Sequence, residues 1–275
     1  MFKEKFDLSH KVALVVGGRG RLGSQFCAAL AEFGATVHSA DQSSAAAGGD
    51  VRELSQLGVK QHDVNVTDPA SVRTLIDEVM TTDSQIDVLL YSVTAKPNDF
   101  YKPFTECSLD GWQLVMKTEM DGLFLVTREV GRVMEQVSKG SIIFLSSIYG
   151  IVGNDQRIYE GSNLEQVHGI AHEGAAKRIY SHAVYAAAKG AVISLTRYLA
   201  AYWGEHNIRV NCISPGGIAH PAENEQFVKR YSERVPFGRK GRVDEISGAA
   251  VFLASDASSY VTGHNLVVDG GWTAW

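Results

Sequence analysis

The sequence predicts an α/β fold: a doubly wound, mostly parallel sheet of about seven strands with helices on both faces. The first observation is that short β-branched or apolar runs alternate regularly with longer segments of helical period. The second is a glycine-rich turn, residues 17–23, directly after the first of these runs. The third is a length of 275 residues without a dividing linker, which favours a single domain over residues 1–275.

Seven runs are expected to form strands, because each is short, apolar and bounded by polar residues or glycine. They cover residues 12–16, 37–40, about 59–66, 86–90, 141–145, 208–213 and 265–268. Helical patterns fill most gaps, most clearly at residues 70–82, 109–136 and 186–206. Strands that alternate with helices form βαβ units, so neighbouring strands should run parallel.

Composition excludes several classes of protein. Lys and Arg number 26 against 31 Asp and Glu, and the net charge of −5 argues against nucleic-acid binding. No apolar run approaches the roughly 18 residues of a membrane span, and residues 1–10 hold no apolar signal core. Three widely spaced cysteines form no metal-binding pair. We therefore expect a cytoplasmic protein without a metal site and without a membrane or nucleic-acid partner.

The glycine-rich turn is a candidate phosphate-binding site. Glycines let the backbone approach a pyrophosphate, which then lies at the helix N-terminus, where free N–H groups and the positive dipole end favour it. The placement between the first strand and an amphipathic helix strengthens dinucleotide binding over an ordinary turn. The candidate cofactor-binding residues here are Gly17, Arg19, Arg21, Leu22 and Gly23.

Asp41 closes the second predicted strand and bears on the choice of cofactor. A carboxylate there can accept hydrogen bonds from the adenosine ribose hydroxyls and repels a 2′-phosphate. Arg19 and Arg21 point the other way, because basic residues in the turn could bind that phosphate. We favour NAD, with NADP as the alternative.

A serine pair and a Tyr-x-x-x-Lys sequence are candidates for catalysis. Ser147 follows the fifth predicted strand, and Tyr185 and Lys189 open a long helix. Residues at i and i+4 share one helix face, so the ammonium can lie near the phenol. A neighbouring cation favours phenolate and lowers the phenol pKa, which suits proton exchange with an alcohol or a ketone.

In this order, the turn, Asp41, the serine pair and Tyr185/Lys189 resemble the short-chain dehydrogenase/reductase family, a Rossmann-fold family of oxidoreductases. The resemblance extends over nearly the whole chain and includes residues 86–89, 209–216, 252–256, 260–263 and 268–271. It implies that Tyr185 is the general acid/base, that Lys189 lowers its pKa and binds the nicotinamide ribose, and that Ser147 polarises the substrate carbonyl.

The resemblance also implies further cofactor contacts. Asn65 and Val66 are similar to the pair that borders adenine, with Asn in place of the usual Asp. Pro215, Gly216 and Ile218 are similar to the segment that contacts the nicotinamide carboxamide. Hydride transfer itself would come from the cofactor.

Besides one long insertion, the sequence departs from the family pattern in four places. Arg21 replaces a glycine of the turn, Val16 replaces a threonine, and residues 91–94 (Tyr-Ser-Val-Thr) replace Asn-Asn-Ala-Gly. Glu119 stands where the family has an asparagine that joins the active site through a water. Its charge could hold Lys189 protonated or alter the chemistry, and we count Glu119 among the candidate catalytic residues.

The largest departure is an insertion of about 25 residues at about 151–182, between Ser147 and Tyr185. Its position predicts that it lies beside the active site as a lid or substrate-binding loop. His168 and His172 are expected to face solvent or substrate, because no acid or cysteine completes a metal site. Three basic residues could meet an anionic substrate or form a solvated loop: Arg157, Lys177 and Arg178.

The most probable function is NAD(H)-dependent interconversion of a secondary alcohol and a ketone, with a sugar-like polyol or keto-sugar as small-molecule substrate. A weaker similarity, at residues 159–161, 197–200 and 269–275, links the chain to members that modify surface-glycan or flagellin sugars. Alternatives are a 3-oxoacyl thioester reductase that uses NADP(H) and a dinucleotide-binding regulatory protein with little turnover. Relatives pack the helix at 186–203 against a partner subunit, so a homo-oligomer, dimer or tetramer, is expected.

Overall fold

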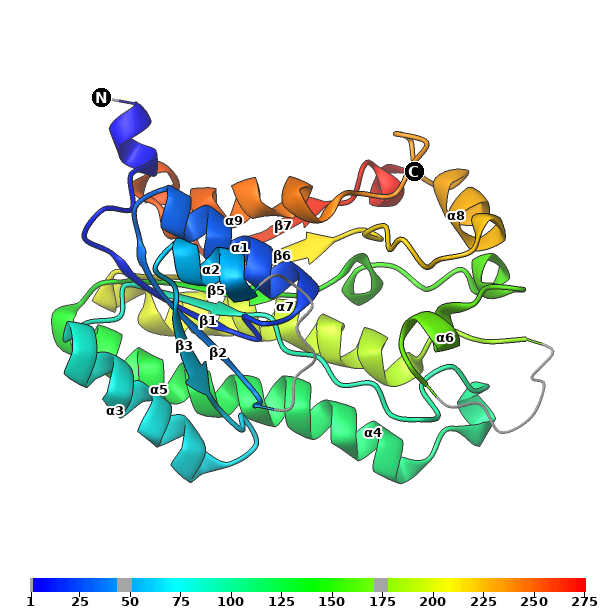
Figure 1. The fold of residues 1–275 in the computed structure, drawn as a ribbon, viewed down its shortest axis with the longest axis horizontal. Coiled ribbons are helices and arrows are strands. Elements are labelled where there is room, and N and C mark those ends of the chain that lie inside the picture. Colours follow the sequence, from blue (N-terminus) through cyan, green and yellow to red (C-terminus); the bar gives the residue numbers. More distant parts are fainter. Residues whose placement is uncertain (1, 44–50, 171–177) are drawn as a thin grey trace.

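The computed structural model describes residues 2–43, 51–170 and 178–275, and its centre is a parallel β-sheet (Figure 1). Within these residues, the sheet has seven strands in the order β3-β2-β1-β4-β5-β6-β7, all paired parallel. The strands are β1 Val12–Val16, β2 Thr36–Asp41, β3 Lys60–Asp63, β4 Val88–Tyr91, β5 Gly140–Leu145, β6 Ile208–Pro215 and β7 Asn265–Val268. The predicted fold class is confirmed.

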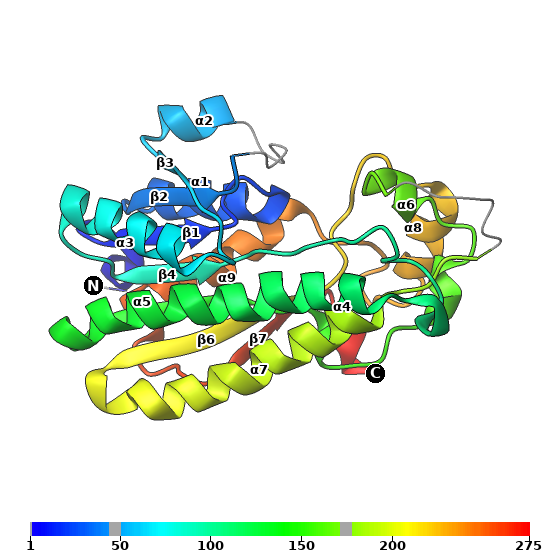
Figure 2. The ribbon, with the colours of Figure 1, turned by 90° about the horizontal axis from the view of Figure 1, so that it is seen from below.

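Helices cover both faces of this sheet (Figure 2). One face packs on α1 and α9, and the other on α3, α5 and α7, with a separate buried apolar cluster on each side. The described helices are α1 Arg21–Glu32, α2 Val51–Gln56, α3 Pro69–Asp83, α4 Leu109–Met116, α5 Gly122–Val137, α6 Leu164–Val167, α7 Ala183–Trp203, α8 Glu225–Ser232 and α9 Ser247–Ala254. No helix in the described part of the chain is both long and apolar enough to cross a membrane.

Two elements differ from their predicted form. Strand β3 ends at Asp63 rather than at residue 66, because Val64 and Val66 turn away from the sheet edge and pack in the core. The helix expected at 109–136 is interrupted by one π-helical turn, Lys117–Asp121, between α4 and α5. Single π-turns inside α-helices are frequent at functional sites, and this one carries Glu119.

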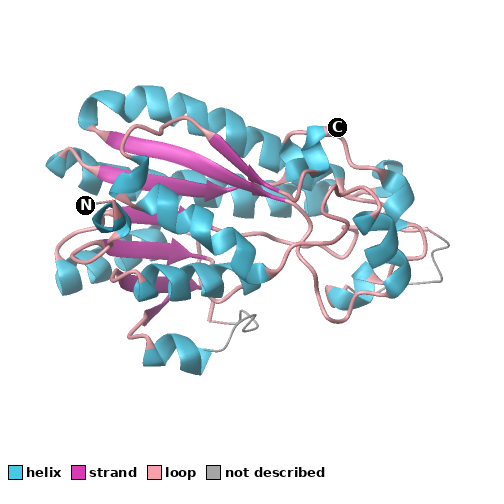
Figure 3. Ribbon diagram, turned by 90° about the horizontal axis from the view of Figure 1, so that it is seen from above, coloured by secondary structure: helices cyan, strands magenta, loops and turns pink. Residues whose placement is uncertain are grey.

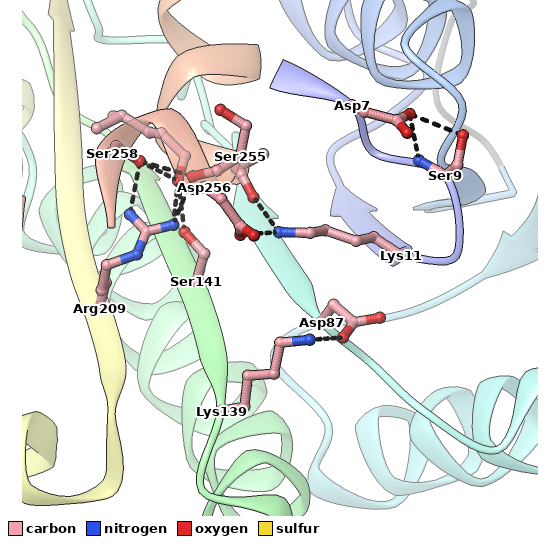
Figure 4. A network of polar contacts seen from close by, with 12 residues as sticks. Asp7, Ser9, Lys11, Asp87, Lys139, Ser141, Arg209, Ser255, Asp256 and Ser258 are labelled. Atoms are coloured by element: carbon pink, nitrogen blue, oxygen red, sulfur yellow. Dashed lines mark hydrogen bonds and ion pairs between the residues drawn. The ribbon is translucent and has the colours of Figure 1, made fainter. Parts of the chain in front are cut away.

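Hydrogen bonds and ion pairs between polar side chains link the segments at the edge of the sheet where the strands begin (Figure 4). Lys11 pairs with Asp256 at 2.7 Å, and Arg209 donates to the Leu253 carbonyl at 2.8 Å and to Ser258 Oγ at 2.8 Å. These contacts occupy the edge where the strands begin. In open parallel sheets, ligands bind at the opposite edge, beyond the carboxyl ends of the strands.

Helices α6 and α8 stand beyond those carboxyl ends (Figures 2 and 3), and a third apolar cluster lies around them. It joins four parts of the chain that are distant in sequence, and we call it the satellite cluster: Phe100, Tyr101, Ile148, Ile158, Tyr159, Leu164, Ile170, Ile179, Phe227, Tyr231, Val235 and Trp272. The described part of the 151–182 segment therefore folds against the segments that follow β4 and β6. It forms a packed wall rather than a solvated loop.

Candidate active site

A cavity of about 570 Å³ opens at the carboxyl edge of the sheet and continues to the satellite cluster. Its lining comes from the glycine-rich turn, from the segments after β4, β5 and β6, from α7 and from α6. Predicted site residues that line it are Arg21, Leu22, Gly23, Ser147, Tyr185, Lys189, Pro215, Gly216 and Ile218. The structure thus brings together residues up to 197 positions apart (21 to 218) around one space.

The glycine-rich turn has the backbone that a bound pyrophosphate requires. Gly17 has φ +85°, and a Cβ there would lie 2.5 Å from the Ser92 carbonyl oxygen. A Cβ on Gly23 would overlap the Gly17 carbonyl. Helix α1 begins after Gly20, which caps it without a side chain. The residues from Gly20 to Gly23, where α1 begins, line the cavity, and a helix N-terminus with free N–H groups suits a dinucleotide phosphate.

Arg21, in place of the family glycine, extends across the cavity. Its Nη2 donates to the Ala219 carbonyl oxygen at 2.6 Å, on the segment that follows β6. Burial lowers the pKa of this guanidinium, and nearby Glu223 opposes that shift. The side chain therefore bridges the turn and the β6 segment over the place where phosphates would lie.

Asp41 lies at the end of β2 and is held by main-chain groups. Its carboxylate accepts from the Arg19 N–H at 3.1 Å and from the Gln42 N–H at 2.8 Å. The Arg19 guanidinium is turned away to Asp63 at 2.8 Å and to the His62 carbonyl at 3.2 Å. Arg19 is therefore already neutralised by a carboxylate, whereas the charge of Asp41 stands at the end of the second strand.

Asn65 and Val66 lie outside the cavity lining. The Asn65 side chain accepts from the Thr67 N–H at 3.1 Å and from its hydroxyl at 2.9 Å. Val66 is 3% exposed and packs beside Gly122, where a Cβ would lie 2.8 Å from it. The two residues form the turn after β3, at the same sheet edge as Asp41.

Ser147, Tyr185 and Lys189 meet at the floor of the cavity. Lys189 Nζ lies 5.2 Å from the Tyr185 ring centroid and donates to the Leu145 carbonyl at 3.1 Å. Burial raises the pKa of Tyr185, while Lys189 and a hydrogen bond with Ser147 lower it and Glu119 raises it. The net shift is upward, so the expected lowering by Lys189 is present but is outweighed by burial.

Glu119 lies directly behind Lys189. Its Oε2 is 3.0 Å from Lys189 Nζ, its Oε1 accepts from the Thr94 hydroxyl at 2.6 Å, and the residue is 1% exposed. Burial lowers the pKa of Lys189, but the charges of Glu119 and Tyr185 together raise it above the ordinary value. Of the two outcomes considered from the sequence, the geometry favours the one in which Glu119 holds the ammonium protonated.

The segment after β6 is fixed by buried polar contacts. The Gly217 N–H donates to the Tyr231 hydroxyl at 2.5 Å, and Lys240 pairs with Glu223 at 2.5 Å. The Lys240 ammonium also lies 4.7 Å from the Phe227 ring centroid. These contacts hold the stretch that carries Ile218 and His220 against the cavity.

The 151–182 segment contributes Val167 and His168 to the cavity. The Tyr101 hydroxyl hydrogen-bonds His168 Nδ1, and burial followed by the charge of Lys96 lowers the pKa of His168 to about 3. His168 is therefore a neutral imidazole that faces the substrate space. His172 lies outside the described residues. In the described ranges, no group of three His, Cys, Asp or Glu side chains is arranged for a metal ion.

The basic residues of that segment do not reach the cavity as described. Arg157 pairs with Asp155 at 2.8 Å on the surface, and Arg178 lies 5.1 Å over the Tyr180 ring. Lys177 falls outside the described residues. Besides Arg21 and Lys189, one further cation lines the cavity, Lys96, which we did not predict. Its only sequence signal is its place five residues after the end of β4, in a loop without periodicity.

Comparison with known proteins identifies the family of this chain. A family model described as "Enoyl-(Acyl carrier protein) reductase" (adh_short_C2) matches residues 20–167 and 165–273. The chain is 34% identical over 279 residues to a 2-dehydro-3-deoxy-D-gluconate 5-dehydrogenase of Pseudoalteromonas atlantica, covering 98% of both chains. It is 31% identical over 280 residues to a galactitol 2-dehydrogenase (L-tagatose-forming) of Cereibacter sphaeroides, covering 100% of this chain and 99% of that one.

Among solved structures, a gluconate 5-dehydrogenase from Burkholderia cenocepacia J2315 in complex with NADP and tartrate is similar throughout. Its TM-score is 0.82 at 30% identity, with all of both chains covered. Family model, relatives and solved structures all point to one family. The chain therefore belongs to the short-chain dehydrogenase/reductase family, whose members are NAD(P)-dependent oxidoreductases acting on CH–OH groups.

Proposed function

We propose that the protein interconverts a secondary alcohol and a ketone with NAD(H), on a sugar-like polyol or keto-sugar. The observation that carries the proposal is one cavity lined both by the phosphate-binding turn and by Ser147, Tyr185 and Lys189. The relatives named above act, by their names, on sugar acids and polyols of this kind.

The nicotinamide supplies or accepts the hydride when it is bound. In the reducing direction, Tyr185 gives its phenolic proton to the substrate oxygen, and in the oxidising direction its phenolate takes that proton. Ser147 holds the same oxygen by a hydrogen bond. Lys189 favours the phenolate and is positioned for the nicotinamide ribose, while Glu119 keeps the ammonium charged and in place.

NAD is proposed over NADP because of Asp41. Its carboxylate would repel a 2′-phosphate at the end of β2, and Arg19 is already neutralised by Asp63. Asn65 and Val66 are proposed to border the adenine from the turn after β3. The NADP of the similar solved structure is a property of that protein.

The other candidate functions remain predictions. A 3-oxoacyl thioester reductase would suit NADP(H) better than Asp41 allows, and a regulatory protein would not need Ser147, Tyr185 and Lys189 all in one cavity. A surface-glycan or flagellin sugar substrate and a cytoplasmic location also stay predictions from the sequence.

Homo-oligomerisation is proposed through α7. Its outer face exposes Tyr198 and Tyr202, which are 64% and 56% exposed and stack on each other at 6.2 Å. Tyrosines are enriched at protein interfaces, because their rings offer a large apolar contact area with a polar tip. Trp272 is not part of that face, because it is buried against Tyr231, with ring centroids 4.4 Å apart.

Tyr185→Phe tests the proposal. The change removes the hydroxyl that exchanges the proton, so turnover of polyols with NAD should fall by at least about 100-fold. NADH binding, followed by fluorescence, should stay within about threefold because the phenol hydroxyl makes no phosphate contact. Tyr180→Phe, a tyrosine outside the cavity lining, is the control and should keep full activity. Intact turnover in Tyr185→Phe would show that another group is the acid/base.

A further inference from the structure

The charge of the cavity lining carries an inference about the substrate, which rests on the function proposed above. Among the described lining residues are three cations, Arg21, Lys96 and Lys189, and no carboxylate. Cationic donors bind a carboxylate more strongly than the hydroxyls of a neutral polyol or keto-sugar. The question is therefore which of the three charges is already compensated.

Two of them are. Lys189 is paired with Glu119 at 3.0 Å and has a proposed role beside Tyr185. Arg21 donates to the Ala219 carbonyl at 2.6 Å and stands at the N-terminus of α1, where a cofactor phosphate would take its charge. Neither needs a substrate group to balance it.

Lys96 is the exception. In the part of the chain that the structure describes, it makes no hydrogen bond or ion pair, and it is exposed at the cavity. Glu119, the acid whose charge acts on Lys96, is itself paired with Lys189 at 3.0 Å. Protein surrounds Lys96 closely enough that burial lowers its pKa. An anion beside it would relieve this cost.

The position of Lys96 assigns that anion to the substrate rather than to the cofactor. The chain runs from the end of β4 past Lys96 to Phe100 and Tyr101, which belong to the satellite cluster. The Lys96 charge acts on His168 and His182, both from the 151–182 segment, and the Arg21 charge acts on Lys96 and on His168 from the side of the glycine-rich turn. His182 in turn lies against Tyr185, with ring centroids 5.1 Å apart. Lys96 is therefore on the side of the cavity where substrate would meet the catalytic tyrosine.

Polar groups without charge line the cavity on the same side as Lys96, and we call this side the substrate wall. His168 is uncharged because burial lowers its pKa to about 3, and the phenol of Tyr149 also lines the cavity. Neutral imidazole and phenol groups donate to and accept from hydroxyls. The wall thus offers one free positive charge among several hydroxyl-binding groups.

We propose that Lys96 binds the carboxylate of a polyhydroxylated acid, so that the substrate is an aldonate or its keto form rather than a neutral polyol. The hydroxyl-bearing carbon chain would extend from Lys96 along His168 to Tyr185. Lys96 is then a specificity-determining residue that does not itself take part in proton exchange.

The experiment compares substrates that differ in one group. D-gluconate and D-galactonate are paired with glucitol and galactitol, in which CH₂OH replaces the carboxylate. For wild type, Lys96→Met and Lys96→Arg, kcat/KM with NAD and the affinity of each compound for the enzyme–NADH complex are measured, the latter by calorimetry. Lys102→Met is the matched control, because Lys102 is exposed but does not line the cavity.

Wild type should prefer the acids. Lys96→Met should weaken the binding of the acids by roughly 10- to 100-fold, which corresponds to the loss of one hydrogen bond to a charged group. The affinity for the neutral compounds should change by less than about twofold. Lys96→Arg should keep most of the preference, and Lys102→Met all of it. These results support the proposal.

Two results would overturn it. One is equal binding of acids and neutral polyols by wild type. The other is a Lys96→Met variant that loses NADH affinity together with both substrate classes, which would assign Lys96 to the cofactor. Absence of turnover for every compound would count against the proposed function, and the calorimetric preference would still decide the role of Lys96.

Discussion

The buried pair of Glu119 and Lys189 should contribute strongly to folding stability. The two residues are 1% and 4% exposed, and their charged atoms are 3.0 Å apart. At an effective dielectric constant of about 20, two unit charges at this distance attract by about 5.5 kcal/mol. Desolvation offsets part of this, and removing one partner of a buried pair costs about 3–5 kcal/mol. Glu119→Gln should lower the free energy of unfolding by that amount near neutral pH.

The loss should shrink as the pH rises. In wild type the pKa of Lys189 is raised, so the stability from the pair is present below the unfolded-state pKa of about 10.4 and is lost above the folded one. In Glu119→Gln burial dominates and the pKa falls below that of the unfolded state. Between these two values the folded variant binds fewer protons than the unfolded chain, so its stability increases with pH.

Urea unfolding of both proteins at pH 6.5 and pH 9.5, followed by tryptophan fluorescence, measures this difference. Glu129→Gln, on helix α5 directly after the π-turn that carries Glu119, is the control: its partners Arg128 and Arg132 are 36% and 63% exposed, so a loss of less than about 1 kcal/mol is expected. A loss below 1 kcal/mol at pH 6.5 in Glu119→Gln, or one that does not narrow at pH 9.5, would refute the role of the pair.

Two further substitutions test candidate cofactor-binding residues. Asp41→Ala should reduce the preference for NAD over NADP by roughly tenfold or more, because a like charge beside the 2′-phosphate is removed; Asp256→Ala, at the opposite sheet edge, should leave the ratio of the two dissociation constants unchanged. Gly17→Ala should lower the free energy of unfolding in urea more than Gly58→Ala does. Both glycines have a positive φ, at which a side chain costs roughly 1–2 kcal/mol. Only in Gly17→Ala does the new Cβ also meet the Ser92 carbonyl. Equal losses would mean that the turn has room to move.

The sheet was predictable because each central strand is a short apolar run buried on both faces. All five residues of β1, for example, are at most 4% exposed. The edge strand β3 was predicted too long, because Val64 and Val66 are as apolar as strand residues. In the structure they lie in the turn after β3 and pack in the core from there. The break between α4 and α5 was missed, because one extra residue in a π-turn leaves the helical pattern on either side intact.

The candidate site was predictable where spacing or motif order fixes it. Tyr185 and Lys189 at i and i+4 fall on one helix face, and both line the cavity. Lys96 was not foreseen, because a lysine in an aperiodic loop has no pattern that distinguishes it from a surface lysine. The partner of Arg19 depends on how β3 pairs with β2, which places Asp63 next to Asp41. Such cross-strand neighbours follow from register rather than from local sequence.

The satellite cluster has a consequence for engineering. Because Ile158 and Leu164 from the 151–182 segment pack with Phe227, Tyr231 and Trp272, the substrate wall is one cooperative unit made of separate stretches of chain. Substitutions in such a unit are expected to be epistatic, with effects that do not add. Grafting residues 151–182 alone onto another dehydrogenase would leave their apolar side chains without partners. Transfer of specificity would require the segments after β4 and β6 and Trp272 to be moved together with residues 151–182.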